Sequence, residues 1–110
     1  MALLSAKLLG DLDEWHFLLE KWYAARCNGT WEHGYGVKIG TIDNPGWTVQ
    51  IGLHGTVKQN SKLGRVKLDR TEDNWIHYWI EKSEFHMRCG ALNLSEAIQL
   101  FVDWFDSNSK

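Results

Sequence analysis

Proline and cysteine are scarce in this sequence, which has one proline and two cysteines among 110 residues. Cys27 and Cys89 lack the C-x-x-C spacing of a zinc site, and they are too few for a disulfide scaffold. We therefore expect two free thiols, which fit the reducing cytoplasm. No apolar run approaches the roughly 18 residues of a membrane-spanning helix, and Met1–Gly10 does not read as a signal peptide. A cytoplasmic protein without a membrane partner is expected.

An excess of charge of one sign is also lacking, because the formal net charge is −2. A protein that binds nucleic acid by neutralising phosphates normally carries a basic patch, so we expect no nucleic-acid partner. The histidines, at positions 16, 33, 54, 77 and 86, include no pair two or four residues apart. Zinc sites usually contain such a pair, so the sequence predicts neither a metal nor another cofactor.

Tryptophan, by contrast, is abundant, with seven in the chain. Two of them bound the segment 31–47, which has the pattern of a β-hairpin. Apolar residues and threonine alternate with glycine and lysine over Tyr35–Thr41, as in a strand with one buried face. A second alternating run, Trp47–Leu53, predicts the antiparallel partner of that strand.

The turn of this hairpin contains the single proline of the chain. Pro45 fixes φ near −65° and Gly46 tolerates a positive φ, so together they predict the centre of a type II turn. Asp43 and Asn44 can close such a turn through hydrogen bonds between side chain and backbone.

Helices are expected at both ends of the chain. Asp11–Glu14 and Asn93–Glu96 have the capping-box pattern, and apolar residues three and four apart follow each of them. The first helix should end at Gly29, a residue suited to a left-handed cap. Further strands are expected at 65–71, at 75–82 and, as a short fifth strand, around 85–87.

This order of elements predicts an α+β fold, in which both helices cover one face of an antiparallel meander of four to five strands. We expect an N-terminal extension at residues 1–10, one domain over residues 11–106, and a polar tail at residues 107–110.

The fourth expected strand carries bulky residues on both faces. One face has Ile76, Tyr78 and Ile80, and the other has Trp75, His77 and Trp79. A strand that is buried on both faces is usually aliphatic, so we assign the first set to the helix-covered core and the two tryptophans to the open face. The alternative is a sheet that curls and covers them.

An enzyme would need a nucleophile with a base, a metal cluster or paired carboxylates. The candidates are Cys27, Glu32 and His33, which would have to converge in a pocket. Cys27 is most simply a small buried residue in the last turn of the first helix. The residues alone therefore leave two classes open, namely a small α+β binding domain and a small enzyme or ligand-binding domain.

Several motifs resemble those of the immunity protein 53 family of bacterial polymorphic toxin systems. They are Trp22-Tyr23, Cys27-Asn28-Gly29, Trp31-Glu32-His33-x-Tyr35-Gly36-Val37, Thr41-x-Asp43-Asn44-Pro45-Gly46-Trp47, Ile51-x-Leu53, Arg70-x-Glu72, and Asn93-Leu94-x-Glu96 with Phe101 to Trp104. The resemblance covers nearly all of the chain after Gly10.

The resemblance implies an immunity protein that is not an enzyme and that blocks a cognate toxin domain by stoichiometric occlusion. The mild acidity of the chain favours a basic nuclease as the toxin, although a peptidase or a deaminase also fits. The density of polar and aromatic residues suggests a partner-binding surface made of Trp31, Glu32, His33, Tyr35, Asp43, Asn44, Trp75 and Trp79.

Overall fold

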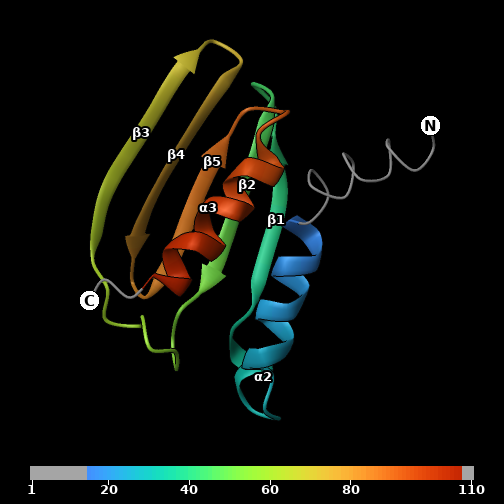
Figure 1. The fold of residues 1–110 in the computed structure, drawn as a ribbon, viewed down its shortest axis with the longest axis vertical. Helices are drawn as coiled ribbons and strands as arrows, with labels where there is room; N and C mark the ends of the chain where they lie inside the picture. The colour runs from blue at the N-terminus through green and yellow to red at the C-terminus, as the bar shows by residue number, and fades with distance from the viewer. Residues whose placement is uncertain (1–14, 108–110) are drawn as a thin grey trace, which may run out of the picture.

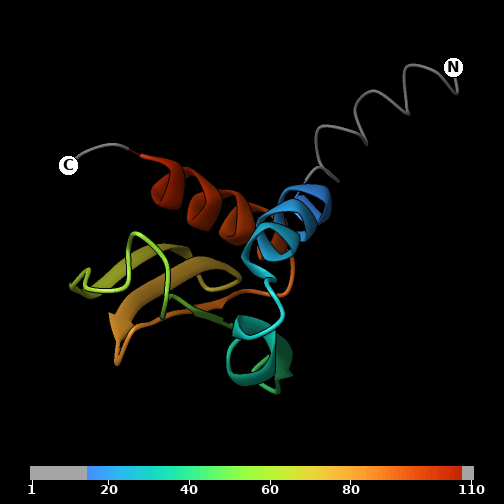
Figure 2. The ribbon, with the colours of Figure 1, turned by 90° about the horizontal axis from the view of Figure 1, so that it is seen from below.

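The computed structural model describes residues 15–107, which form a five-stranded antiparallel sheet with a long helix from each end of the chain packed on one face (Figures 1 and 2). Residues 15–26 are helical, and they are followed by α2 (Trp31–Gly34), β1 (Val37–Ile42), β2 (Gly46–Gly52), β3 (Leu63–Thr71), β4 (Asn74–Glu81), β5 (Glu84–Cys89) and α3 (Leu94–Asp106). The expected α+β class is confirmed. Met1–Gly10 and the Asp11–Glu14 capping box lie outside the described residues. No helix in the described part is long and apolar enough to cross a membrane.

The strand order is β1-β2-β5-β4-β3, so the sheet differs from the simple meander that we expected. After β2, residues 53–62 carry the chain to the far edge of the sheet, where β3 begins (Figure 1). The meander β3-β4-β5 then returns inward until β5 pairs with β2. This order places the apolar residues of β5, which are fully buried, at the centre of the sheet beneath α3.

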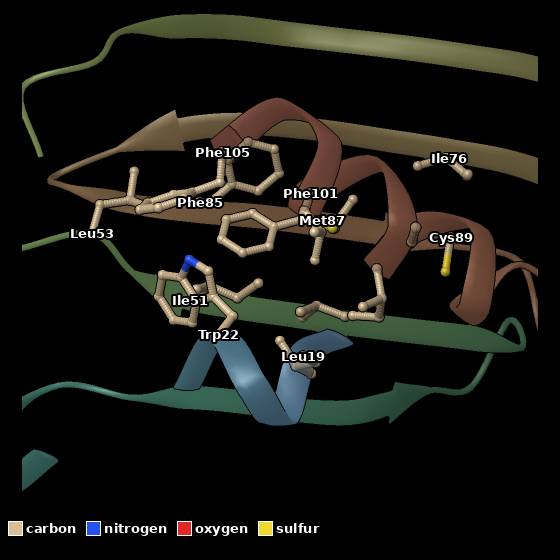
Figure 3. Close-up of a cluster of buried hydrophobic side chains, with 14 of the residues drawn as sticks. Leu19, Trp22, Ile51, Leu53, Ile76, Phe85, Met87, Cys89, Phe101 and Phe105 are labelled. Carbon is tan, nitrogen blue, oxygen red and sulfur yellow. The ribbon is translucent and has the colours of Figure 1, made fainter. Parts of the chain in front are cut away.

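The core lies between the sheet and the two long helices (Figure 3). Trp22, from the helix over residues 15–26, meets Phe101 and Phe105 of α3 edge to face, with ring centroids 5.2 and 5.3 Å apart. Phe85 of β5 approaches Phe101 from the sheet at 5.1 Å. These edge-to-face contacts join both helices to the central strands, and aromatic pairs of this kind stabilise a core beyond the burial of their area.

The hairpin turn differs from the predicted type II turn. Ile42 pairs with Gly46, so the loop consists of the three residues Asp43, Asn44 and Pro45. Gly46 has no positive φ and belongs to β2. Glycine is required there for a different reason, since a Cβ atom would overlap the backbone carbonyl oxygen of Cys89. The hairpin is therefore pressed directly against the chain that leaves β5.

The start of α3 is held by Asn93, although not through the capping box that we expected. The Asn93 side chain makes no cap hydrogen bond to the backbone of its own helix, although its Nδ2 donates to Glu96 Oε1 at 3.4 Å. Its Oδ1 instead accepts a hydrogen bond from the Trp75 backbone amide at 3.2 Å, and its Nδ2 donates to Asn74 Oδ1 at 3.0 Å. Two hydrogen bonds from Arg70 to Glu96, of 3.0 and 2.6 Å, add a second link between α3 and the end of β3. These contacts fix α3 relative to the β3–β4 turn.

The close packing of Gly46 predicts that Gly46→Ala lowers the free energy of unfolding by about 1–3 kcal/mol, the usual cost of overpacking. Gly34→Ala is the matched control, because a Cβ at Gly34 meets nothing within 4 Å and the residue lies in α2. That control should leave stability unchanged or raise it by up to about 1 kcal/mol. Urea unfolding measures both, and equal midpoints for the two variants would contradict the packing argument.

Candidate functional site

The eight residues that the sequence suggested for partner binding lie in three places, at each of the two ends of β1 and on β4. Trp31, Glu32 and His33 belong to α2, with Tyr35 directly after it. Asp43 and Asn44 form the tip of the hairpin at the other end of β1 (Figure 1). The remaining two, Trp75 and Trp79, lie on β4. The structure therefore does not bring all eight into one contiguous site.

At the α2 end, Glu32 holds a loop together. Its two carboxylate oxygens accept hydrogen bonds from the backbone amides of Asn28 and Gly29, at 2.9 and 2.8 Å. In return, Asn28 Oδ1 accepts hydrogen bonds from the backbone amides of Thr30 and Trp31, both at 2.9 Å. Gly29 has φ 91°, so the expected positive φ is confirmed, but the first helix ends at residue 26, earlier than we expected. This reciprocal arrangement satisfies backbone donors on both sides of the loop.

The hydrogen bonds to the Glu32 carboxylate favour its ionised form. Its pKa lies below the ordinary value, chiefly because of a hydrogen bond from its own backbone amide and then because of those from Asn28 and Gly29, which together outweigh the opposing effect of desolvation. Glu32 therefore has a structural role in this loop, independent of any partner.

Trp31 is also a structural residue. Its side chain is only 6% exposed, and its indole N–H donates to the backbone carbonyl of His54 at 2.8 Å. It packs edge to face on Trp22, with ring centroids 6.0 Å apart. The segment 31–34, which lies within the span that the sequence assigned to a β-hairpin, is thus a helical turn anchored in the core by Trp31.

His33 and Tyr35 are the exposed members of this end. Tyr35 is 44% exposed and stacks on His54, with ring centroids 4.6 Å apart. Both His33 and Tyr35 line a groove of about 700 Å³ between the helix over residues 15–26 and the outer edge of the sheet. They are available to a partner in a way that Trp31 is not.

The face of the sheet opposite the helices is open, and it carries both predicted tryptophans of β4. Ile76, Tyr78 and Ile80 pack into or against the core, as expected, and the alternation of the strand turns Trp75 and Trp79 away from it. This assignment of the two faces is confirmed.

Trp79 is the centre of a row of planar side chains on the open face. The Arg65 guanidinium lies over its ring, 4.3 Å from the centroid. His86, its cross-strand neighbour on β5, stacks nearly parallel to it at 5.3 Å and 7°. Arginine over tryptophan is a favourable cation–π arrangement, and the row is consequently ordered before any partner arrives.

Next to this row, His77 joins two charged residues of β3. Its Nε2 lies 2.7 Å from Asp69 Oδ1, and its Nδ1 lies 3.3 Å from Arg65 Nη2. The Trp75 ring packs against the His77 ring with centroids 5.1 Å apart. Arg65, His77 and His86 were not among the residues that the sequence suggested for partner binding. Their alternation with core residues was the available signal, but their contacts with the tryptophans depend on cross-strand register.

At the hairpin end of the open face, the surface is hollowed. A hollow of about 440 Å³ has Asn44, Arg65, Trp75 and Arg88 among its lining residues. A smaller hollow of about 240 Å³ adjoins it, and Asn44 and Trp75 line this one too. The structure therefore brings together two of the residues suggested by sequence, Asn44 and Trp75, from segments about 30 positions apart.

The residues of the enzyme alternative do not form a recognisable catalytic group. Cys27, which we expected to be buried, is exposed, and its thiol donates to the Tyr23 carbonyl. No hydrogen bond joins Cys27, Glu32 and His33 side chains in the part of the chain that the structure describes. Burial raises the pKa of Cys89 to about 11, so this thiol is not activated as a nucleophile. Residues 15–107 also contain no cluster of three potential metal ligands.

Comparison with known proteins gives one positive result. A family model described as Immunity protein 53 matches residues 17–106. Neither the curated proteins nor the solved structures contain a match to the chain.

Removing the Glu32 carboxylate should destabilise the protein only where that group is ionised. Because its folded pKa is lowered, its stabilising effect is present above the ordinary glutamate value of about 4.3 and is lost as the pH falls through the folded pKa. We expect Glu32→Gln to lower the urea midpoint at pH 7, and the difference from the parent to shrink below about pH 4.

The control is Glu20→Gln, which removes a carboxylate that is exposed on the helix over residues 15–26. It should leave the midpoint unchanged at both pH values. If Glu32→Gln unfolds at the parent midpoint at pH 7, the carboxylate does not hold the loop.

Proposed function

The chain belongs to the immunity protein 53 family, and we propose that it protects a bacterium by binding a cognate toxin domain and blocking it without turnover. Membership of this family implies an immunity function and a toxin partner. We further propose that the protein blocks the toxin by stoichiometric occlusion, through a preformed surface on the open face of the sheet.

The ordered aromatic surface around Trp75 and Trp79 supports this proposal most strongly. Tryptophan and arginine supply most of the binding energy in protein interfaces, particularly where their side chains are already held in place. Here Arg65 and His86 fix the ring of Trp79, and Asp69 and Arg65 both contact His77. A partner that covers this face would meet few side chains that still have to be ordered.

We place the centre of the contact surface on Trp75 and Trp79, with Asn44 and Asp43 at the hairpin end and His33 and Tyr35 at its periphery. Trp31 and Glu32 support this surface indirectly, since one is buried and the other holds the α2 loop. All eight residues suggested by sequence therefore have a role in this proposal. Six of them contact the toxin, and Trp31 and Glu32 stabilise the fold.

The carboxylates of the smaller hollow beside Trp75 favour a basic toxin, whereas the larger hollow has both arginines and carboxylates in its lining. Glu72 and Asp73 line the smaller hollow together with Asn44 and Trp75, and Asp43 is the neighbour of Asn44. A nuclease presents cationic groups that bind substrate phosphates, and carboxylates placed opposite those groups would exclude the substrate. We therefore propose a nuclease as the toxin class.

Truncation of the open-face tryptophans should weaken the complex. We expect Trp79→Ala and Trp75→Ala each to raise the Kd for the toxin domain at least about 30-fold, as for interface hot spots of 2 kcal/mol or more. Phe17→Ala is the control, because Phe17 is also a large exposed aromatic residue, at 52% exposure, but lies on the helix over residues 15–26. Isothermal titration calorimetry with a catalytically inactivated toxin domain measures all three.

Urea unfolding of the same variants identifies losses that arise from misfolding. If both tryptophan variants remain folded and bind as tightly as the parent, the open face is not the contact surface.

The proposed activity itself is tested by co-expression with the toxin domain encoded immediately upstream of the gene. We expect the chain to restore growth and to co-purify with the toxin in a one-to-one complex. Rescue without a complex would contradict blocking by occlusion and favour an enzymatic or indirect route. A failure to rescue would contradict immunity against that toxin.

A further inference from the structure

Strand β1 forms one edge of the sheet, and its outward backbone groups have no hydrogen-bond partner among residues 15–107. The Gly52 amide donates to the carbonyl of Gly36 at 2.9 Å, immediately before the register Val37↔Ile51 begins. Directly opposed residues of antiparallel strands alternate between hydrogen-bonded and non-hydrogen-bonded pairs. The backbone groups of Val37, Ile39 and Thr41 therefore point away from β2, toward the outside of the sheet.

The two edges of the sheet differ in how well they are protected against a further strand. β3, at the far edge, has two register shifts and carries the charged residues Arg65, Lys67, Asp69 and Arg70. β1 pairs with β2 over six consecutive residues without a shift, and Lys38 is its only charged residue. Bulges and charged residues on an edge strand hinder the addition of another strand. Because β1 has fewer of them than β3, β1 is the edge at which a further strand can pair more readily.

The surface beside this edge is shaped for an extended chain. The groove of about 700 Å³ runs between the helix over residues 15–26 and the start of β1, with Trp15, Leu19 and Tyr23 on the helix side. Val37 lines the strand side from the helix-covered face and Lys38 lines it from the open face, so the groove follows the outer edge of β1. A strand added to β1 would direct alternate side chains into this apolar groove and the others toward the open face.

The positive charge of Lys38 indicates which type of residue an added strand should carry beside it. Its side chain lies on the open-face side of β1, opposite Gln50, and forms no salt bridge with a carboxylate within residues 15–107. A lysine on an edge strand discourages pairing unless the incoming strand brings an acidic residue opposite it. A second copy of β1 would bring only its own lysine and no carboxylate, because its sequence is VKIGTI.

We infer that the β1 edge binds an extended segment of the toxin, which adds to the sheet as a sixth strand and places an acidic residue beside Lys38. This inference rests on the proposed function and adds a second point of contact to it. The partner would then be held both by the open face and by main-chain hydrogen bonds along the edge, which select an extended conformation.

The test removes one outward backbone donor with little change to the β1–β2 ladder. Proline is tolerated on an edge strand where the missing N–H would face outward, so Thr41→Pro should fold. It should raise the Kd for the catalytically inactivated toxin domain about tenfold or more, because a carbonyl of the added strand loses its partner. Thr41→Val, which keeps the N–H, is the control and should bind within about twofold of the parent.

The charge is tested separately. Lys38→Glu should raise the Kd about fivefold or more, because it places like charges side by side on adjacent strands. Lys62→Glu makes the same change at an exposed residue of the loop before β3 and should have little effect.

Amide hydrogen exchange of the parent chain gives a readout that does not depend on any variant. With the inactivated toxin bound, exchange at Ile39 and Thr41 should slow at least about tenfold, as for newly formed ladder hydrogen bonds. The edge inference would be overturned if Trp79→Ala weakens toxin binding, Thr41→Pro does not, and exchange at the Ile39 and Thr41 amides is unchanged in the parent complex. The proposed function would remain supported by that result.

Two other results would also overturn the inference. If the free chain dimerises and protects these amides without toxin, the occupant of the edge is a second copy. If the parent chain forms no complex at all, both the inference and the proposed function fail.

Discussion

The antiparallel pairing of β2 with β5 is the interaction on which the rest of the structure depends. Six residue pairs join β2 to β5. They connect the β1–β2 hairpin to the β3–β4–β5 meander, and each of these two units is formed by one continuous segment of the chain. The buried residues of these two strands form the floor on which α3 and Trp22 pack. The same pairing makes the opposite face continuous from Lys38 to Arg65, so it creates both the core and the candidate surface.

The sequence predicted the kinds of elements well, because they follow from local periodicity. Every expected strand and both long helices are present within the described residues. The strand order could not be predicted, since alternation says which face a residue occupies but not which strand lies beside it. The role of Gly46 was misassigned for the same reason, because the contact that requires glycine is with Cys89, 43 residues later in the chain.

The candidate site was predictable to a similar degree. Trp75 and Trp79 could be assigned to the open face. Both faces of their strand carry bulky residues, and the face that is richer in aliphatic residues is better suited to the core. Trp31 and Glu32 could not be assigned their structural roles, since a four-residue helix is too short to show a helical period. The stacking of Arg65 and His86 on Trp79 depends on β3–β4–β5 register, which composition does not encode.

We propose that one copy of this protein blocks one toxin domain by covering it with a surface that is largely ordered in advance. The most direct test is a titration of toxin activity with increasing amounts of the purified chain, at toxin concentrations far above the Kd. Stoichiometric blocking predicts a linear loss of toxin activity that ends at one equivalent and does not change with incubation time. A continuing loss of activity over time at a fraction of an equivalent would show turnover and contradict it.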